Sequence, residues 1–180
     1  YQKQLLPFYD VFDEMRYFEA GSTTTVFEIK GQKVGIAICE DLWNDKGADN
    51  YHYDDNPLAQ YRDVNVDVLL SLNSSPFVRS KVEERLDKVA PASIDGLTIV
   101  YVNQVGGQDE LVFDGGSFVA QGGQLTHFSD ELFEDSYAIA DLLDRKVVKA
   151  PAALTKNKRL TDLLTLGLRD YVKKSGFSEL

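Results

Sequence analysis

The sequence has 180 residues, which suits one domain or one domain with a piece of another. Hydrophobic residues make up 43% and charged residues 27%, so the chain can bury a core and is not expected to be disordered. The net charge of −10 argues against a nucleic-acid partner, and no apolar run is long enough to cross a bilayer, so no membrane partner is expected. The single cysteine excludes an internal disulfide framework and suits a reducing compartment. We therefore expect a cytoplasmic protein.

Hydrophobic runs, turn signals and helical spacing predict a mixed α/β chain. In chain order, they predict strand 24–29, strand 33–38, helix 57–63, strand 66–72, helix 78–92, strand 97–102, short antiparallel strands within 104–124, strand 136–141 and helix 160–174. The opening residues 1–18 predict an irregular segment. Because the first residue is Tyr1 and the only methionine is Met15, we expect a processed chain or a piece of a longer one.

The order of these elements predicts a sheet with a parallel centre. Strands 24–29 and 33–38 flank a Lys-Gly-Gln turn, which predicts a hairpin whose second strand is buried. The strand, loop, helix, strand order that follows predicts parallel neighbours in an α/β layer. In helix 78–92 the apolar residues Val82, Leu86 and Val89 are expected inside, and the charged residues outside are Glu83, Glu84, Arg85 and Lys88.

The character of the sequence changes after Asp141. Residues 144–159 are basic and rich in alanine, which is typical of a linker. An amphipathic helix is then predicted, with one face formed by Leu160, Leu163, Leu164, Leu168, Tyr171 and Val172. We therefore expect a first domain over 1–143, a linker over 144–159 and the start of another domain over 160–180.

Cys39 is the first candidate for chemistry. It stands at the end of a buried strand, where a turn can expose a nucleophile on a rigid support. A single cysteine is also often a small buried hydrophobic residue, and both readings stay open from position alone. Its neighbours Glu40 and Asp41 disfavour a thiolate, so a nearby cation would be needed.

The possible cationic partners are two histidines and the lysines. His52 lies in a polar loop and His127 in a stretch typical of an edge strand, and neither has a distinctive setting. The stretch from Lys3 to Glu14 mixes charged and aromatic residues, which indicates either a surface segment or a polar pocket. A lysine is therefore the remaining candidate.

Metal and phosphate sites are not predicted. The acidic loop with Asp45, Asp49, Asp54 and Asp55 lacks the order of an EF-hand loop. The glycine pairs at 106–107 and 115–116 lack a phosphate-binding pattern and are interpreted as turns.

Several motifs occur together in the order of a known family. They are K-x-x-LP-x-Y-x-VFDE-x-RYF at 3–18, CED-x-W at 39–43, LLSLNSSPF at 69–77, YVNQVGGQDELVFDGGSFV at 101–119 and GLRDYVKKSGF at 167–177. This pattern resembles the nitrilase (carbon–nitrogen hydrolase) superfamily, and within it the glutaminase domains of glutamine-dependent NAD synthetases. The resemblance implies the central and C-terminal part of an α-β-β-α sandwich of the nitrilase type, followed by the first helix of a synthetase domain.

The resemblance also implies roles for particular residues. The superfamily uses a Glu-Lys-Cys triad, in which Cys39 matches the nucleophile and Lys3 the lysine. The glutamate lies upstream of the lysine in the family, so it is not expected within this sequence, and Glu14 matches a supporting acidic residue. The residues expected to contact or surround the substrate glutamine are Tyr9, Glu40, Trp43, Ser75 and Lys81.

The implied reaction is hydrolysis of L-glutamine at Cys39, which supplies ammonia for the ATP-dependent amidation of nicotinic acid adenine dinucleotide to NAD. No cofactor is expected in this chain, whereas ATP and Mg²⁺ are expected in the synthetase domain. We expect a homo-oligomer, and we expect the 180-residue chain to be inactive by itself because it lacks the upstream glutamate.

Two rival readings remain. A stand-alone amidase of the same superfamily would act on another amide, but it would need no appended helix after a basic linker. A non-catalytic interaction domain on this fold would not need both Lys3 and Cys39.

Overall fold

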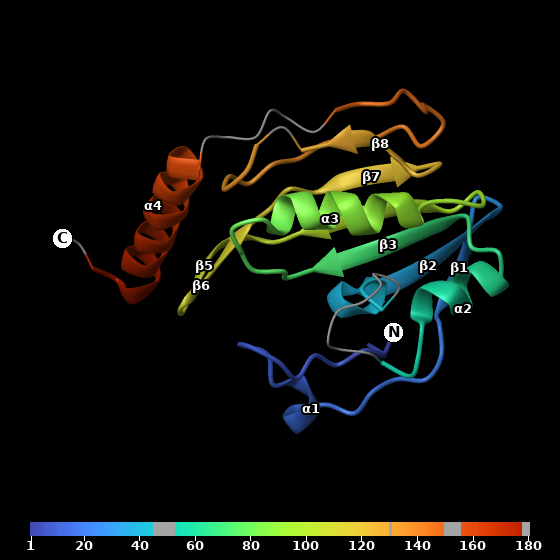
Figure 1. Ribbon diagram of the computed structural model, residues 1–180, viewed down its shortest axis with the longest axis horizontal. Coiled ribbons are helices and arrows are strands. Elements are labelled where there is room, and N and C mark those ends of the chain that lie inside the picture. The colour runs from blue at the N-terminus through green and yellow to red at the C-terminus, as the bar shows by residue number, and fades with distance from the viewer. Residues whose placement is uncertain (45–52, 130, 150–155, 178–180) are drawn as a thin grey trace.

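The computed structural model describes residues 1–44, 53–129, 131–149 and 156–177, and its centre is one mixed β-sheet (Figure 1). The six strands lie in the order β1-β2-β3-β4-β7-β8. Their bounds are Val26–Ile29, Gln32–Ile38, Val68–Asn73, Thr98–Asn103, Phe118–Gln121 and Gln124–Phe128. A separate two-stranded sheet consists of β5 (Val105–Gln108) and β6 (Leu111–Asp114).

The helices lie around this sheet. They are α1 (Glu14–Tyr17), η1 (Cys39–Leu42, a 3₁₀ turn), α2 (Pro57–Asp63), α3 (Lys81–Val89), η2 (Ala90–Ala92, also 3₁₀) and α4 (Lys156–Ser175). Within the described ranges, no helix is both long and apolar enough to span a membrane.

The predicted parallel centre is confirmed. β1 and β2 form the antiparallel hairpin, and β2, β3 and β4 are parallel neighbours. Ile38 at the end of β2 lies opposite Leu72 of β3, which lies opposite Val102 of β4. The carboxyl ends of three strands therefore meet at one edge of the sheet, where ligand sites of parallel sheets usually form.

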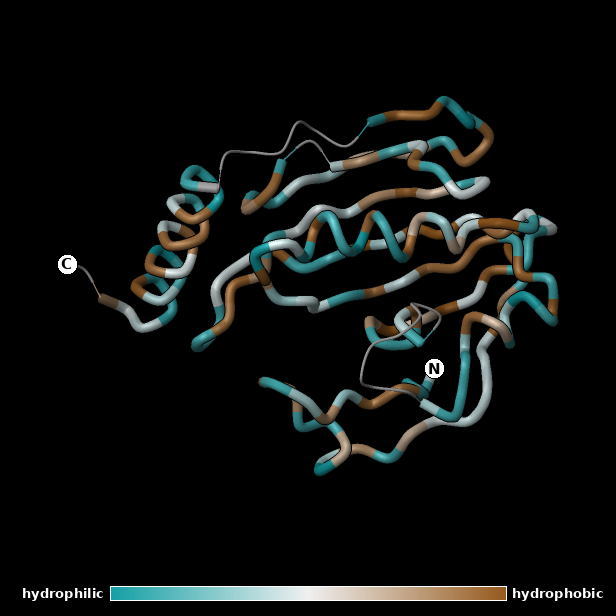
Figure 2. Tube along the Cα trace, viewed as in Figure 1, coloured by the Kyte–Doolittle hydropathy of each residue, from teal (hydrophilic) through white to brown (hydrophobic). Residues whose placement is uncertain are grey.

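The two faces of the sheet differ in burial. One face packs under α2 and α3, and its residues, including Leu69, Ile99 and Tyr101, are almost fully buried. The hydrophobic segments of the chain gather in these central strands (Figure 2). The opposite face is apolar but open, since Leu72 and Val102 are 55% and 50% exposed. Such a face is what a second sheet covers in a sandwich.

The strand predicted at residues 136–141 is wrong. This segment pairs with no strand among the described residues, and Tyr137 and Ile139 are 89% and 84% exposed. The edge position belongs instead to β8, which contains His127, the histidine expected in an edge-like stretch. Residues of the segment line a cavity of about 420 Å³ together with residues of β4, β7 and β8, and Gln121 donates to the Leu142 carbonyl at 2.8 Å.

The helix predicted over 78–92 is shorter, and one of its residues was placed on the wrong side. The helix α3 begins at Lys81, and η2 continues from it over Ala90–Ala92. Arg85, expected outside, is 1% exposed. It shares the buried face with Val82 and Val89 because Asp114 neutralises its charge at 2.7 Å.

The last helix begins within the predicted linker and packs on the β5–β6 hairpin. Asp170 accepts from the Gly107 amide at 2.8 Å, and Lys174 donates to the Gly107 carbonyl at 2.6 Å. A Cβ on Gly107 would lie 3.0 Å from the Gly167 Cα, so the two backbones meet closely. Leu166 is the buried leucine, whereas Leu164 of the predicted face is exposed. The domain limits themselves stay predictions.

Candidate active site

A cavity of about 540 Å³ opens at the edge where β2, β3 and β4 end. Four of the sequence-predicted site residues line it, namely Lys3, Glu14, Cys39 and Glu40. Lys3 and Glu14 come from the opening segment, and Cys39 and Glu40 come from η1. Lys3 and Cys39 are 36 residues apart in the sequence. The cavity is therefore built by long-range packing, and its position follows from the parallel strand order.

Cys39 occupies a backbone conformation that is rare for its residue type. The strand β2 ends at Ile38, and Cys39 starts η1 with a φ of +46°. A left-handed, non-glycine residue between a strand and a helical turn resembles the sharp elbow that projects a nucleophile from a sheet. This geometry favours the nucleophile reading of Cys39 over that of a small core residue.

Asp41 ties the opening segment to the end of β2. Its carboxylate is fully buried, and Oδ1 accepts from the amides of Gln4 and Leu5 at 3.1 and 2.9 Å. Oδ2 accepts from the Ile38 amide at 2.9 Å and from the Tyr1 hydroxyl at 2.7 Å. Asp41 therefore holds Lys3 beside Cys39. Sequence reasoning missed this role, although the Cys-Glu-Asp run placed an acidic residue directly beyond a buried strand.

Lys3 and Glu14 form an ion pair in the cavity. Lys3 Nζ lies 2.6 Å from Glu14 Oε2, and both side chains are partly buried. The short helix α1 carries Glu14, and the Glu14 amide donates to the Pro7 carbonyl at 3.1 Å, which folds the segment back on itself. The Lys3 ammonium is therefore held in one position in the cavity by its ion pair with Glu14.

The electrostatic environment of Cys39 combines opposing effects. The pKa of the Cys39 thiol is raised to about 11 as the net result: burial raises it most, the charges of Glu40 and Glu14 also raise it, and Lys3 and a backbone hydrogen bond from Ser74 lower it. The thiol is thus neutral at pH 7 in this state. A thiolate would form when a substrate or a base takes the proton, with Lys3 and Ser74 stabilising the charge.

Glu40 is held by two tyrosines. Its buried carboxylate accepts from the Tyr9 hydroxyl at 2.8 and 2.9 Å and from the Tyr53 hydroxyl at 3.0 Å. The predicted site residue Tyr9 therefore does not line the cavity itself, but it is hydrogen-bonded to Glu40, which does. Tyr53 was not singled out from the sequence, since it lies in the polar loop before α2.

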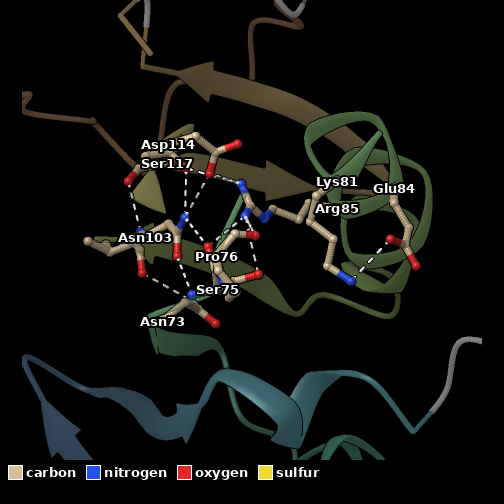
Figure 3. A network of polar contacts seen from close by, with 11 residues as sticks. Asn73, Ser75, Pro76, Lys81, Glu84, Arg85, Asn103, Asp114 and Ser117 are labelled. Atoms are coloured by element: carbon tan, nitrogen blue, oxygen red, sulfur yellow. Dashed lines mark hydrogen bonds and ion pairs between the residues drawn. The ribbon is translucent and has the colours of Figure 1, made fainter. Parts of the chain in front are cut away.

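The other predicted substrate residues do not line the Cys39 cavity. Trp43 is buried in the core, and Lys81 lies over its ring with Nζ 4.3 Å from the centroid. Lys81 also pairs with Glu84 at 3.1 Å (Figure 3). Ser75 is buried one residue beyond the cavity-lining Ser74, and Asn103 and Arg85 contact its backbone. Their contacts with a substrate stay predictions.

The second wall of the cavity is uncharged and was missed from the sequence. Its polar residues follow two neighbouring strands and are Asn73, Ser74, Asn103 and Gln104. Asn73 and Asn103 lie opposite each other in register at the ends of β3 and β4. Two asparagines that each end a buried strand were the available signal.

The remaining candidates lie apart from this cavity. His127 is on β8 and lines the separate cavity under residues 136–142. Asp54 and Asp55 are exposed, while His52, Asp45 and Asp49 fall outside the described residues. Among the residues that the structure describes, no group of three His, Cys, Asp or Glu side chains could hold a metal ion.

The sequence is similar along its whole length to glutamine-dependent NAD(+) synthetases. The proteins of that name from Acinetobacter baylyi and Synechocystis sp. are each 38% identical to the chain, over 184 and 188 residues. Each alignment covers 99% of this chain but only 32% and 33% of the relatives. The chain thus spans about one third of the length of the curated relatives it matches. No protein-family model matches the chain.

Solved structures give the same result. The glutamine-dependent NAD+ synthetase from Acinetobacter baumannii, solved with ADP, superposes with a TM-score of 0.86 at 40% identity, covering 100% of this chain and 33% of that one. An amidase from Nesterenkonia sp. AN1, with acrylamide added to its active-site cysteine, shares the fold at a TM-score of 0.57 and 22% identity, covering 72% of this chain and 46% of that one. The predicted nitrilase-type fold and the predicted resemblance are therefore confirmed: over its whole length, the chain is related to about one third of a glutamine-dependent NAD(+) synthetase.

Proposed function

We propose that this chain is the glutamine-hydrolysing part of a glutamine-dependent NAD synthetase. The observation that carries the proposal is the meeting of Cys39, Lys3 and Glu14 in one cavity, in a chain whose curated relatives bear that name. The rival reading, a stand-alone amidase, is not favoured. Its representative matches only 72% of the chain at 22% identity, whereas the synthetases match nearly all of it at up to 38%.

The proposed chemistry begins with attack of the Cys39 Sγ on the side-chain amide carbon of glutamine. Lys3 and the Glu40 amide donate to the oxyanion of the tetrahedral intermediate. The thiol proton moves to the leaving nitrogen, so that ammonia departs and a thioester remains. Water then attacks the thioester, which releases glutamate and restores the Cys39 thiol.

The base that carries these protons would be the glutamate that the family resemblance places upstream of Lys3. Glu14 would support the site by fixing Lys3, to which it is bonded at 2.6 Å. Tyr9, Glu40, Trp43, Ser75 and Lys81 would surround the glutamine, and Lys81 would exchange Glu84 for the substrate carboxylate.

The ammonia would serve a second reaction in the rest of the protein. There, ATP with Mg²⁺ would adenylate nicotinic acid adenine dinucleotide, and ammonia would displace AMP to give NAD. A homo-oligomeric, cytoplasmic enzyme is part of the same proposal.

The test compares glutamine with ammonium as nitrogen source in the full-length protein. Cys39→Ala should abolish NAD formation from glutamine and leave formation from ammonium chloride intact, because Cys39 would only produce ammonia. A thiol-reactive glutamine analogue should label Cys39 in the wild type. Glutamine-driven activity in the variant, or no label on Cys39, would exclude this function.

A further inference from the structure

Behind the uncharged wall of the cavity lies a buried ion pair that the proposed mechanism does not use. Arg85 of α3 and Asp114 at the end of β6 are 1% and 0% exposed, and Arg85 Nη1 lies 2.7 Å from Asp114 Oδ1 (Figure 3). In the described part of the chain, no other ion pair has both side chains so deeply buried.

This ion pair is not expected to add much to the stability of the fold. Taking two charges out of water costs several kcal/mol per ion, and apolar residues of similar volume are often as stable. The pair is also incompletely bonded, because Asp114 Oδ2 and Arg85 Nε have no hydrogen-bond partner among the described residues. We therefore expect the pair to act by holding neighbouring parts of the chain in place.

Arg85 holds the loop that follows β3. Its Nη2 donates to the Ser75 carbonyl at 2.8 Å, to the Ser75 hydroxyl at 3.2 Å and to the Pro76 carbonyl at 3.4 Å. The guanidinium is planar, so the bond to Asp114 on one nitrogen fixes where the other nitrogen points. Asp114 thereby orients Arg85, and Arg85 orients the loop.

Asn103 grips the same loop from the other side. Its Oδ1 accepts from the Ser75 amide at 2.9 Å, and its Nδ2 donates to the Ser75 and Gly115 carbonyls at 3.2 and 3.0 Å. Both edges of the Ser75 backbone are thus bonded. Asn103 has its side chain directed into this network, as Figure 3 shows.

The loop in turn borders the candidate nucleophile. Ser74 and Cys39 line the same cavity, and hydrogen bonding from the Ser74 backbone is one of the effects that lower the pKa of the Cys39 thiol. A chain of contacts therefore runs from Asp114 through Arg85 and the Ser75 backbone to the amide of Ser74. A small shift of the loop would remove this donor from the sulfur.

We infer that Arg85 and Asp114 are positioning residues for glutamine hydrolysis, which hold the 74–76 backbone so that Ser74 keeps its place beside Cys39 in the cavity wall. The kinetic consequence rests on the proposed function. Arg85→Lys keeps the charge but loses the planar fork, so it cannot hold Asp114 and the loop in the same fixed geometry. We expect kcat for glutamine to fall on the order of 10- to 100-fold, as for other small misplacements near a reacting group.

A second readout follows Cys39 without any substrate. Iodoacetamide alkylates the thiolate, and peptide mass spectrometry of the full-length protein measures the rate at Cys39. Losing a hydrogen bond to a charged acceptor corresponds to about one pKa unit, so alkylation at pH 8 should slow by roughly tenfold in Arg85→Lys. Arg62→Lys is the matched control, since Arg62 donates to the Ala92 carbonyl from α2, and it should keep wild-type rates.

The double variant Arg85→Met with Asp114→Leu separates positioning from folding. It replaces the pair by apolar residues of similar volume, so we expect wild-type thermal stability together with the same losses in kcat and alkylation rate. Folded variants with wild-type alkylation and kcat would overturn the inference. If the wild type hydrolysed no glutamine, the proposed function would fail while the alkylation rates still decided the positioning role.

Discussion

The two walls of the Cys39 cavity differ in where their charged side chains lie. One wall comes from residues 1–43 and carries charge at the cavity itself, on Lys3, Glu14 and Glu40. The other comes from the ends of β3 and β4 and presents only neutral groups, while its charges, Arg85 and Asp114, lie buried behind it.

This difference means that the two walls affect Cys39 in different ways. Charges that border the cavity act on the thiol directly, and they move its pKa in opposite directions. Charges sealed behind the wall neutralise each other and act through the backbone that they hold. Substitutions on the charged wall should therefore change Cys39 electrostatics, whereas those on the neutral wall should matter only where they move the backbone.

The largest effect on this comparison is expected for Lys3→Ala. The Lys3 ammonium would stabilise the oxyanion, which develops in the transition state and is absent from the bound substrate, so kcat for glutamine should fall on the order of 10²-fold or more with little change in KM. Lys33→Ala is the control, because the Lys33 side chain lies at the exposed start of β2, where Nζ donates to the Val64 carbonyl. Equal losses in kcat and in substrate binding would reduce Lys3 to a positioning role.

A smaller loss is expected for Asp41→Asn, which acts on the support of the charged wall. Asparagine cannot accept all four hydrogen bonds that the carboxylate receives, so buried donors are left unpaired at a cost of about 2 kcal/mol in the free energy of unfolding. The Lys3 segment should loosen, and kcat should fall roughly tenfold. Chemical denaturation and glutamine kinetics measure the two effects.

The control for this variant is Asp67→Asn, since Asp67 accepts from the Lys33 amide at an exposed position. A destabilised Asp41→Asn protein with wild-type kcat would show that Asp41 supports the fold without positioning Lys3.

Glu40→Gln tests the sign of the charge effects. The Glu40 carboxylate helps to raise the Cys39 pKa to about 11, so its neutralisation should lower that pKa. Below the pKa, a lower value means more thiolate, and alkylation of Cys39 at pH 8 should be about threefold faster. The difference should shrink as the pH rises through about 11, because the thiol then ionises in both proteins. Glu28→Gln, on the exposed strand β1, should leave the rate unchanged.

Local signals allowed much of the fold to be predicted. The bounds of α2 were predicted correctly because Pro57 favours a helix start, and the structure adds an N-cap at Asn56, whose side chain accepts from the Ala59 amide at 3.0 Å. The hairpin and the parallel centre also follow from patterns a few residues long. The strand predicted at 136–141 was wrong, and β8 was anticipated only as an edge-like setting for His127, because pairing is decided by which edge of the sheet is free, which no local pattern records.

The site could be predicted only in part for the same reason. Motif resemblance singled out Cys39, Lys3 and Glu14, and the structure places them in one cavity. Arg85 was assigned to the surface because its partner, Asp114, lies 29 residues away in the sequence. Asp41 was taken only as a neighbouring negative charge, since its hydrogen bonds reach backbone groups of residues 4 and 5.

The smallest effect is expected for Ser74→Ala, on the neutral wall. The Ser74 hydroxyl donates to Gln104 Oε1 at 2.8 Å in an exposed position, whereas the contact with Cys39 comes from the Ser74 backbone. Alanine keeps that backbone donor, so kcat, KM and the alkylation rate of Cys39 should each stay within about twofold of the wild type. Ser74→Pro, which removes the amide hydrogen, should instead slow alkylation of Cys39. A tenfold loss in Ser74→Ala would mean that the hydroxyl itself contacts the substrate, and the neutral wall would then take part in the chemistry.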